Sequence, residues 1–103
     1  MPNVETSFEI ELREKMLRAQ KECKYNPTRF LQMLAQYGGV DTAKRLIRTG
    51  ITTGRPSDGY VTLYTLNRLN LSMENSVVKP DYMALFTSEE IAYCKRLLEQ
   101  SGQ

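Results

Sequence analysis

The chain contains no histidine, the side chain most often used near neutral pH for proton transfer and nucleophile activation. Two pairs of carboxylates remain for acid–base chemistry, Glu89 with Glu90 and Glu74 with Asp81. Adjacent residues on a helix do not face each other, and a glycosidase-like pair must flank a cleft. No Gly-rich phosphate-binding motif is present. We expect no catalytic residue and no enzyme activity; a small enzyme with a carboxylate site is the remote alternative.

The two cysteines, Cys23 and Cys94, stand alone and far apart in the sequence. A zinc site requires several Cys or His residues at short spacing, so we expect no metal and no cofactor. The spacing favours reduced, apolar cysteines of a cytosolic protein, and a disulfide between the terminal helices stays open. The N-terminal residues are polar and acidic, and no apolar run is long enough for a membrane helix. The sequence therefore predicts a cytoplasmic location without a membrane partner.

A basic segment, residues 24–68, gives the clearest binding signal. It carries seven Lys or Arg residues and two Asp residues, whereas both flanking segments are slightly acidic. Within it, a helix ends at two glycines and another begins with a basic surface, which suits contact with a phosphate. The candidate residues for binding a nucleic acid or an acidic partner are Arg29, Gly38, Gly39, Thr42, Lys44, Arg45, Arg48 and Arg55.

An interpretation without a ligand explains the same glycines. The segment is similar to a helix-hairpin-helix motif, but Asp41 stands where that motif has its second glycine. Asp41 also places negative charge where a phosphate would lie. A glycine that ends one helix and an aspartate that caps the next account for these residues, and we favour this structural interpretation.

A second candidate surface is a partner patch made of Tyr60, Tyr64 and Arg68. Tyrosines and arginines suit partner contacts, although core tyrosines and an Arg68 ion pair with Glu74 or Asp58 are the structural alternative. We also expect some of four methionines to lie on the surface as adaptable contacts: Met16, Met33, Met73 and Met83. The leading hypothesis is a non-catalytic interaction module that binds a protein partner or itself, and nucleic-acid binding through residues 24–68 is the alternative.

Helices must position these side chains, because apolar residues recur at three- and four-residue steps and no strand-like alternation persists. The sequence predicts an all-α, compact single-domain bundle of six to seven mostly short helices over residues 1–103. We expect fraying at 1–5 and 100–103, and an exposed loop over 51–59 with two glycines and a proline. A first helix is predicted over 5–24, a second starting at Asn26-Pro27, and a third from Asp41 or Thr42 to Gly50. Later helices are expected to begin at Ser57 or Asp58, at Ser72, and at the Thr87–Glu90 capping box.

Several short motifs resemble a group of small all-helical bacterial proteins of unknown function. They are Tyr25-Asn26-x-Thr28-Arg29-Phe30-Leu31-x-Met33, Gly38-Gly39-x-x-Thr42-Ala43-Lys44, Ser57-Asp58-Gly59-Tyr60, Arg68-Leu69-x-Leu71-Ser72-x-Glu74 and Leu85-Phe86-Thr87-x-Glu89-Glu90. The chain departs from the group with Tyr64 in place of Trp and Asn70 in place of Asp. The resemblance implies a bacterial or phage cytosolic protein and assigns no activity.

Overall fold

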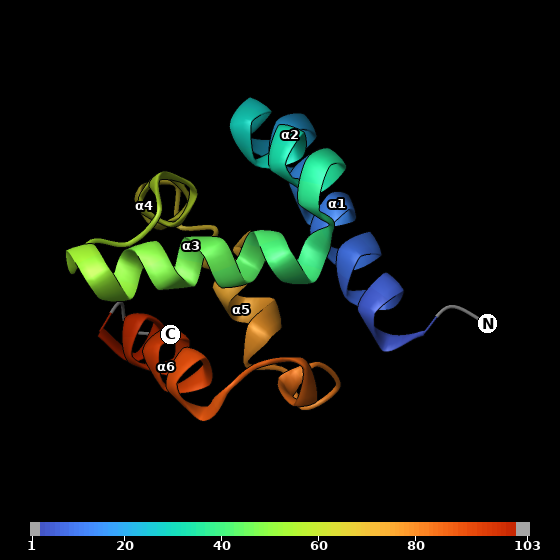
Figure 1. Cartoon of the computed structure of the whole chain (residues 1–103). Coiled ribbons are helices and arrows are strands. Elements are labelled where there is room, and N and C mark those ends of the chain that lie inside the picture. The colour runs from blue at the N-terminus through green and yellow to red at the C-terminus, as the bar shows by residue number, and fades with distance from the viewer. Residues whose placement is uncertain (1–2, 101–103) are drawn as a thin grey trace.

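The computed structural model describes residues 3–100, which form six α-helices and two short 3₁₀ turns with no strand among them (Figure 1). The predicted all-α fold is confirmed. In chain order the elements are α1 (Val4–Cys23), α2 (Thr28–Tyr37), α3 (Gly39–Thr53), α4 (Asp58–Thr65), η1 (Leu69–Leu71), α5 (Met73–Val77), η2 (Met83–Leu85) and α6 (Ser88–Gln100).

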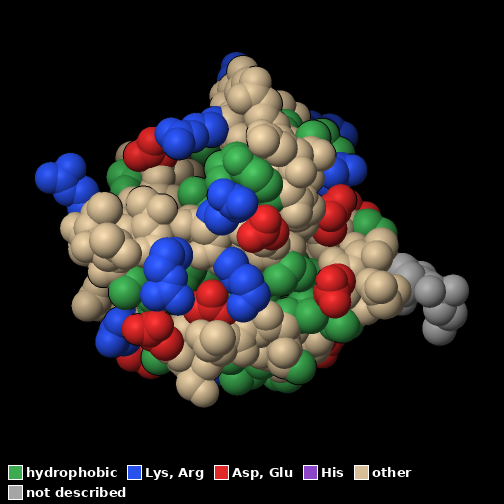
Figure 2. Space-filling model, viewed as in Figure 1, with side chains coloured by type: hydrophobic (Ala, Val, Ile, Leu, Met, Phe, Trp, Pro, Cys, Tyr) green, Lys and Arg blue, Asp and Glu red, His purple; other side chains and the backbone are tan. Residues whose placement is uncertain are grey.

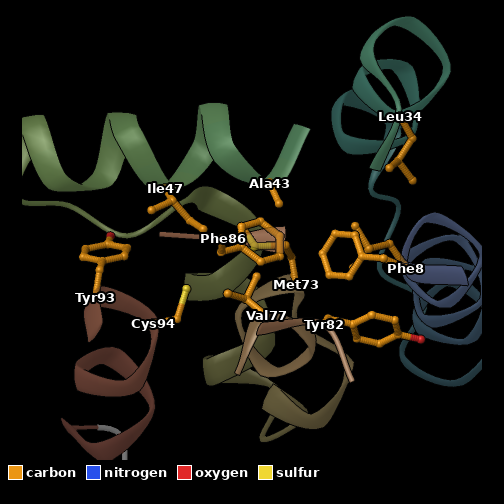
Figure 3. Packing of buried hydrophobic residues seen from close by; sticks show 11 residues of the cluster. Phe8, Leu34, Ala43, Ile47, Met73, Val77, Tyr82, Phe86, Tyr93 and Cys94 are labelled. Carbon is orange, nitrogen blue, oxygen red and sulfur yellow. The ribbon is translucent and has the colours of Figure 1, made fainter. Parts of the chain in front are cut away.

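Helix α3 lies at the centre of the bundle and packs against α1, α2 and α6 (Figure 1). Its inner face carries Ala43 and Ile47, both fully buried. Phe8 of α1 meets the rings of Tyr82 and Phe86 edge-on, with ring centroids 5.2 and 5.3 Å apart (Figure 3). Such edge-to-face pairs add specificity to apolar burial, so the aromatic rings fix how α1 meets the segment before α6.

A second buried cluster joins α1 to α4, η1 and α6. Its members are Met16, Ala19, Tyr60, Leu63, Leu69, Leu71 and Leu98. Both clusters pack against the same partly buried side chains, namely Phe30, Leu31, Val78 and Leu97. The two clusters therefore form one continuous core, as the predicted single domain requires.

The helix starts follow the predicted capping residues in three places. Ser57 caps α4 and Ser72 caps α5, each accepting a hydrogen bond from a backbone N–H three residues later, at 3.2 Å. The capping box before α6 is also present. The Thr87 N–H donates to Glu90 Oε1 at 2.8 Å, and the Glu90 N–H donates to Thr87 Oγ1 at 3.1 Å.

Other boundaries differ from the prediction. Helix α3 begins at Gly39, with Gly38 in the cap position and Asp41 inside the first turn, rather than at a cap formed by Asp41 or Thr42. It does not end at Gly50 but continues to Thr53, and Gly54, which has φ +73°, follows it. The irregular segment is therefore residues 54–57 rather than 51–59. Helix α2 follows Pro27 instead of starting at it, since Pro27 holds the cap position. Residues 4, 5 and 100 are helical instead of frayed, and residues 1–2 and 101–103 lie outside the described part.

A buried polar network joins α1 to α5 and replaces part of the apolar core. The Lys15 ammonium donates to Ser76 Oγ at 2.6 Å and to the Ser72 carbonyl at 3.2 Å. Ser76 donates in turn to Glu11 at 2.6 Å, and the Lys79 ammonium lies 3.0 Å from the same carboxylate. Burial lowers the pKa of Lys15 to about 8, against the opposing effect of Glu11. A buried ammonium with several acceptors fixes the register of the two helices.

Glu74 is the most deeply buried carboxyl group of the described chain. Its residue is 2% exposed, and its side chain accepts a hydrogen bond from the Ser57 hydroxyl at 3.4 Å and one from its own backbone N–H. Charged and titratable groups around it come from α1 (Lys15) and α6 (Tyr93 and Cys94). Burial raises the pKa of Glu74 to about 7, because it outweighs the hydrogen bonds from the Glu74 backbone N–H and the Ser57 hydroxyl and the charge of Lys15.

We predict that Glu74 makes the protein less stable as pH rises. Its folded-state pKa is raised from 4.5 to about 7, so folding favours the protonated form and the advantage fades as pH rises from about 4.5 to 7. The free energy of unfolding should fall by about 2 kcal/mol between about pH 5 and pH 7. Urea titrations at both pH values measure it.

The matched variant is Glu74→Gln, which should remove most of that slope. Lys15 adds no slope between pH 5 and pH 7, because its pKa is about 8 in the folded protein and 10.5 in the unfolded chain. It is protonated in both states over this range, so its contribution to stability changes only above about pH 8. Glu11 and Glu90, whose pKa values are lowered, act only below about pH 5. An unchanged slope in Glu74→Gln would show that Glu74 is ionised in the folded protein throughout this range.

Candidate functional site

The Gly38-Gly39 turn is a helix-packing device. Gly38 has φ +82°, and a Cβ at Gly39 would overlap the backbone of Glu9 on α1. The Glu9 carboxylate accepts a hydrogen bond from the Gly39 N–H at 3.0 Å, so it occupies the place that a phosphate would take at the α3 N-terminus. Thr42 is completely buried. Gly38 and Gly39 therefore belong to the α1–α3 contact and Thr42 to the interior, and we leave all three out of the candidate site.

Lys44 and Arg48 face α6 and are engaged by its acidic first turn. The Lys44 ammonium lies 2.8 Å from Glu90 Oε1 and 5.3 Å from the centre of the Phe86 ring. Burial raises the pKa of Glu90, but the bonds from Lys44 and Thr87 outweigh it and the net pKa is lowered. Arg48 pairs with Glu89 at 3.6 Å, with both side chains exposed. Both basic residues thus complement α6.

The other three basic candidates surround a hollow of about 390 Å³, which we call the basic groove. It lies between the start of α2, the C-terminal half of α3, residues 54–57 and the first turn of α4. Arg29, Arg45 and Arg55 line it, together with an apolar floor that includes Phe30, Met33 and Leu46. Sequence reasoning named the three arginines but missed the floor, because its residues come from two helices that meet only after folding.

The arginines of the groove differ in how they are held. The Arg45 guanidinium carbon lies over the Tyr37 ring, 3.9 Å from its centroid, and the side chain donates a hydrogen bond to Asp41 at 3.3 Å. Neither Arg29 nor Arg55 forms an ion pair with any carboxylate of residues 3–100. Two exposed guanidinium groups therefore keep all their donors for solvent or a ligand.

Tyr25, Ser57 and Asp58 add polar groups to the lining of the groove. Tyr25 lies beside Gly59 at its edge, and burial together with the Asp58 carboxylate raises the pKa of Tyr25, so its hydroxyl stays a donor. Asp58 adds one negative charge to the lining. Ser57 connects the groove to the core, since its hydroxyl donates to Glu74. The arrangement can bind an anionic, partly apolar ligand.

The predicted partner patch is not one surface. Tyr60 is buried and donates its hydroxyl to the Leu97 carbonyl at 2.6 Å, whereas Tyr64 is 54% exposed. Arg68 pairs with Glu22 at 2.6 Å, not with Glu74 or Asp58. Of the four methionines, Met16 and Met73 are buried, whereas Met33 and Met83 are half-buried and Met33 lines the groove. Tyr64 instead shares an exposed face of α4 with Val61.

Three further observations bear on the sequence-based expectations. Cys23 and Cys94 are both free, the first half-buried and the second buried. Within residues 3–100, no helix combines the length and the apolar character needed to cross a membrane. No protein-family model, curated protein or solved structure matches the chain, so the resemblance to small bacterial proteins stays a prediction.

We predict that Gly39→Ala destabilises the fold far more than Gly54→Ala. At Gly39 the new Cβ would meet α1 backbone, which cannot move away as a side-chain tip could, and the loss should be about 2 kcal/mol or more. At Gly54 the Cβ would meet open space, and only the left-handed conformation is penalised, by about 1 kcal/mol. Urea denaturation of the two variants measures both; equal losses would contradict the close approach of α1 to α3.

We predict that Lys44 is needed for stability. Lys44→Glu places a second carboxylate beside the buried Glu90 and should lower the free energy of unfolding by about 2 kcal/mol, a value reduced for the partial exposure of Lys44. The control is Arg48→Glu. Because the pair of Arg48 with Glu89 is exposed, this substitution should lower the free energy of unfolding by only about 0.5 kcal/mol. Thermal unfolding by circular dichroism ranks the two. Equal effects would show that α6 does not engage Lys44.

Proposed function

We propose that the protein is a non-catalytic interaction module whose basic groove binds an acidic segment of a protein partner. The observation that carries the proposal is the pair of unengaged guanidinium groups, Arg29 and Arg55, at the edges of an apolar floor. Of the other twelve Lys and Arg side chains, all of them in the described part of the chain, eight pair with carboxylates, Arg45 of the groove among them, and the remaining four do not line the groove. Arginines left free beside apolar surface are characteristic of protein interfaces.

The lining of the groove favours a peptide with both acidic and apolar side chains. Phe30, Met33 and Leu46 offer apolar area that a purely ionic ligand would leave uncovered. Guanidinium groups at the edge bind carboxylates with two parallel hydrogen bonds and remain partly hydrated, so the desolvation cost stays small. Arg45 contributes a third positive charge and is already immobilised on Tyr37.

Nucleic-acid binding is the alternative, and the distribution of charge favours it less. Lys44 and Arg48 face the acidic start of α6, so the basic residues of α3 do not form one track. Figure 2 shows Lys and Arg side chains interspersed with Asp and Glu on the face that carries α3 and α6.

Catalysis is not part of the proposal. The chain has no histidine, and Glu74, whose pKa is raised to about 7, is buried and does not line the groove. We also propose a cytoplasmic setting, where the free thiols Cys23 and Cys94 stay reduced. Binding a partner there needs only the groove and its charges.

We predict that reversing the free arginines abolishes peptide binding. The probe is a fluorescein-labelled peptide of alternating Glu and Leu residues, titrated by fluorescence anisotropy. Arg29→Glu with Arg55→Glu should weaken binding by at least about tenfold, because each lost charge-assisted contact is worth roughly 1 kcal/mol or more. The fold should be unaffected, since neither side chain makes an ion pair.

The matched control is Lys95→Glu with Arg96→Glu, which changes the net charge equally on exposed positions of α6. Equal loss in both double variants would mean that only net charge matters and would contradict a site in the groove. A 20-nucleotide single strand and the matching duplex are titrated in parallel. Tighter binding of either nucleic acid, lost in the groove variant alone, would overturn the proposal in favour of the alternative.

A further inference from the structure

A second hollow, of about 370 Å³, lies where the start of α1 meets the α2–α3 turn. We call it the acidic hollow. Its charged lining consists only of carboxylates, namely Glu5, Glu9 and Asp41. Glu5 forms no ion pair within residues 3–100, whereas Glu9 and Asp41 pair with exposed arginines, Arg13 and Arg45, both at 3.3 Å. The hollow therefore presents negative charge beside Tyr37 and Val40.

The acidic hollow and the basic groove are neighbours on the same helical hairpin. Asp41 lines the hollow and Arg45 lines the groove, and the two residues are one helical turn apart on α3. The Tyr37 ring, which also lines the hollow, carries the Arg45 guanidinium on its face. Two recesses of similar volume and opposite charge thus border each other across the Arg45–Asp41 pair.

We infer that the acidic segment bound by the basic groove is the acidic hollow region of a second copy of this chain, so that two copies pair about a two-fold axis near Arg45. This inference rests on the proposed function of the groove and names its partner. Rotation about such an axis places the groove of each copy against the hollow of the other. Both contacts form at once, and each matches positive with negative charge.

The chemistry of the two recesses is complementary beyond the sign of the charge. Glu5 supplies an unpaired carboxylate, and Arg29 and Arg55 supply unpaired guanidinium groups. The start of α1 also exposes Val4 (43%) and Ile10 (46%) on either side of these glutamates in sequence. Apolar side chains next to carboxylates are what the apolar floor and charged edges of the groove accept.

The ion pairs already present within each copy do not prevent contacts with the second copy. The Asp41–Arg45 pair is solvent-exposed and the Glu9–Arg13 pair is partly so, and such pairs contribute little to stability. The Asp41 carboxylate can therefore turn toward the second copy at little cost, while Arg45 stays on the Tyr37 ring. Because both contacts are electrostatic and near the surface, the association must weaken as salt screens them.

Charge reversal with complementation tests this arrangement. The groove variant carries Arg29→Glu and Arg55→Glu; the hollow variant carries Glu5→Arg and Asp41→Arg. Each variant alone opposes like charges at both contacts and should be monomeric in sedimentation-velocity runs across a range of concentrations. An equimolar mixture restores opposite charges at both contacts and should form a heterodimer. The unaltered protein should dimerise, with an association constant that falls at least about tenfold from low to high salt.

Every outcome decides the inference. A monomeric native protein at all concentrations, or a mixture that fails to associate, overturns it; assemblies that grow beyond dimers overturn the two-fold arrangement. If Glu5→Arg with Asp41→Arg fails to fold by circular dichroism, Glu5→Arg alone replaces it, since Glu5 makes no ion pair. The Glu-Leu peptide separates the two proposals. Peptide binding by a monomeric native protein refutes the dimer and keeps the groove, whereas absence of both refutes the groove as well.

Discussion

The structure depends on two close approaches that glycine alone permits, one near each end of α3. Gly39 lies against the backbone of Glu9 on α1, and Gly50 lies against the ring and hydroxyl of Tyr93 on α6. A side chain at Gly39 would push the α1 backbone away from α3, whereas a side chain at Gly50 would displace the Tyr93 ring from its place on α3. Because helix positions are set by the closest contacts between them, these two glycines fix α1 and α6 relative to the central helix. The aromatic cluster of Phe8, Tyr82 and Phe86 then fills the space that remains.

This placement of α3 divides its basic residues between two tasks. Lys44 and Arg48, one turn apart, face α6 and meet Glu90 and Glu89. Arg45, rotated by one residue, faces α2 and the groove, where Thr49 and Thr53 continue the same line of the helix. The segment that looks uniformly basic in sequence is therefore split by the helical period of 3.6 residues. Three of its seven basic residues pair with carboxylates of α1 or α6, namely Lys44, Arg48 and Arg68, and three border the groove, namely Arg29, Arg45 and Arg55.

Local sequence signals predicted the helices well but could not locate the site. Ser57, Ser72 and the Thr87–Glu90 box mark helix starts because their side chains bond to backbone groups within three residues. Gly50 gave a wrong prediction of a helix end because its role is not local. It provides room for Tyr93, which lies 43 positions later in the chain. The hydrogen bond from the Gly39 N–H to Glu9 and the apolar floor of the groove likewise depend on contacts between residues far apart in the sequence. A local sequence pattern cannot predict such contacts. The charge pattern identified Arg29, Arg45 and Arg55 as candidates, but it could not show that they line the groove while Lys44 pairs with Glu90.

The distribution of engaged and free charges is what links this fold to binding. In a small helical bundle, most ion pairs are local and cost little to form, so a free arginine is informative only where apolar surface surrounds it. Arg29 and Arg55 meet that condition, and Glu5 offers the opposite charge beside exposed Val4. Complementary charges raise the encounter rate and select the orientation more than they increase affinity. A surface built in this way suits reversible association, in which a modest change of salt or partner concentration shifts the bound fraction.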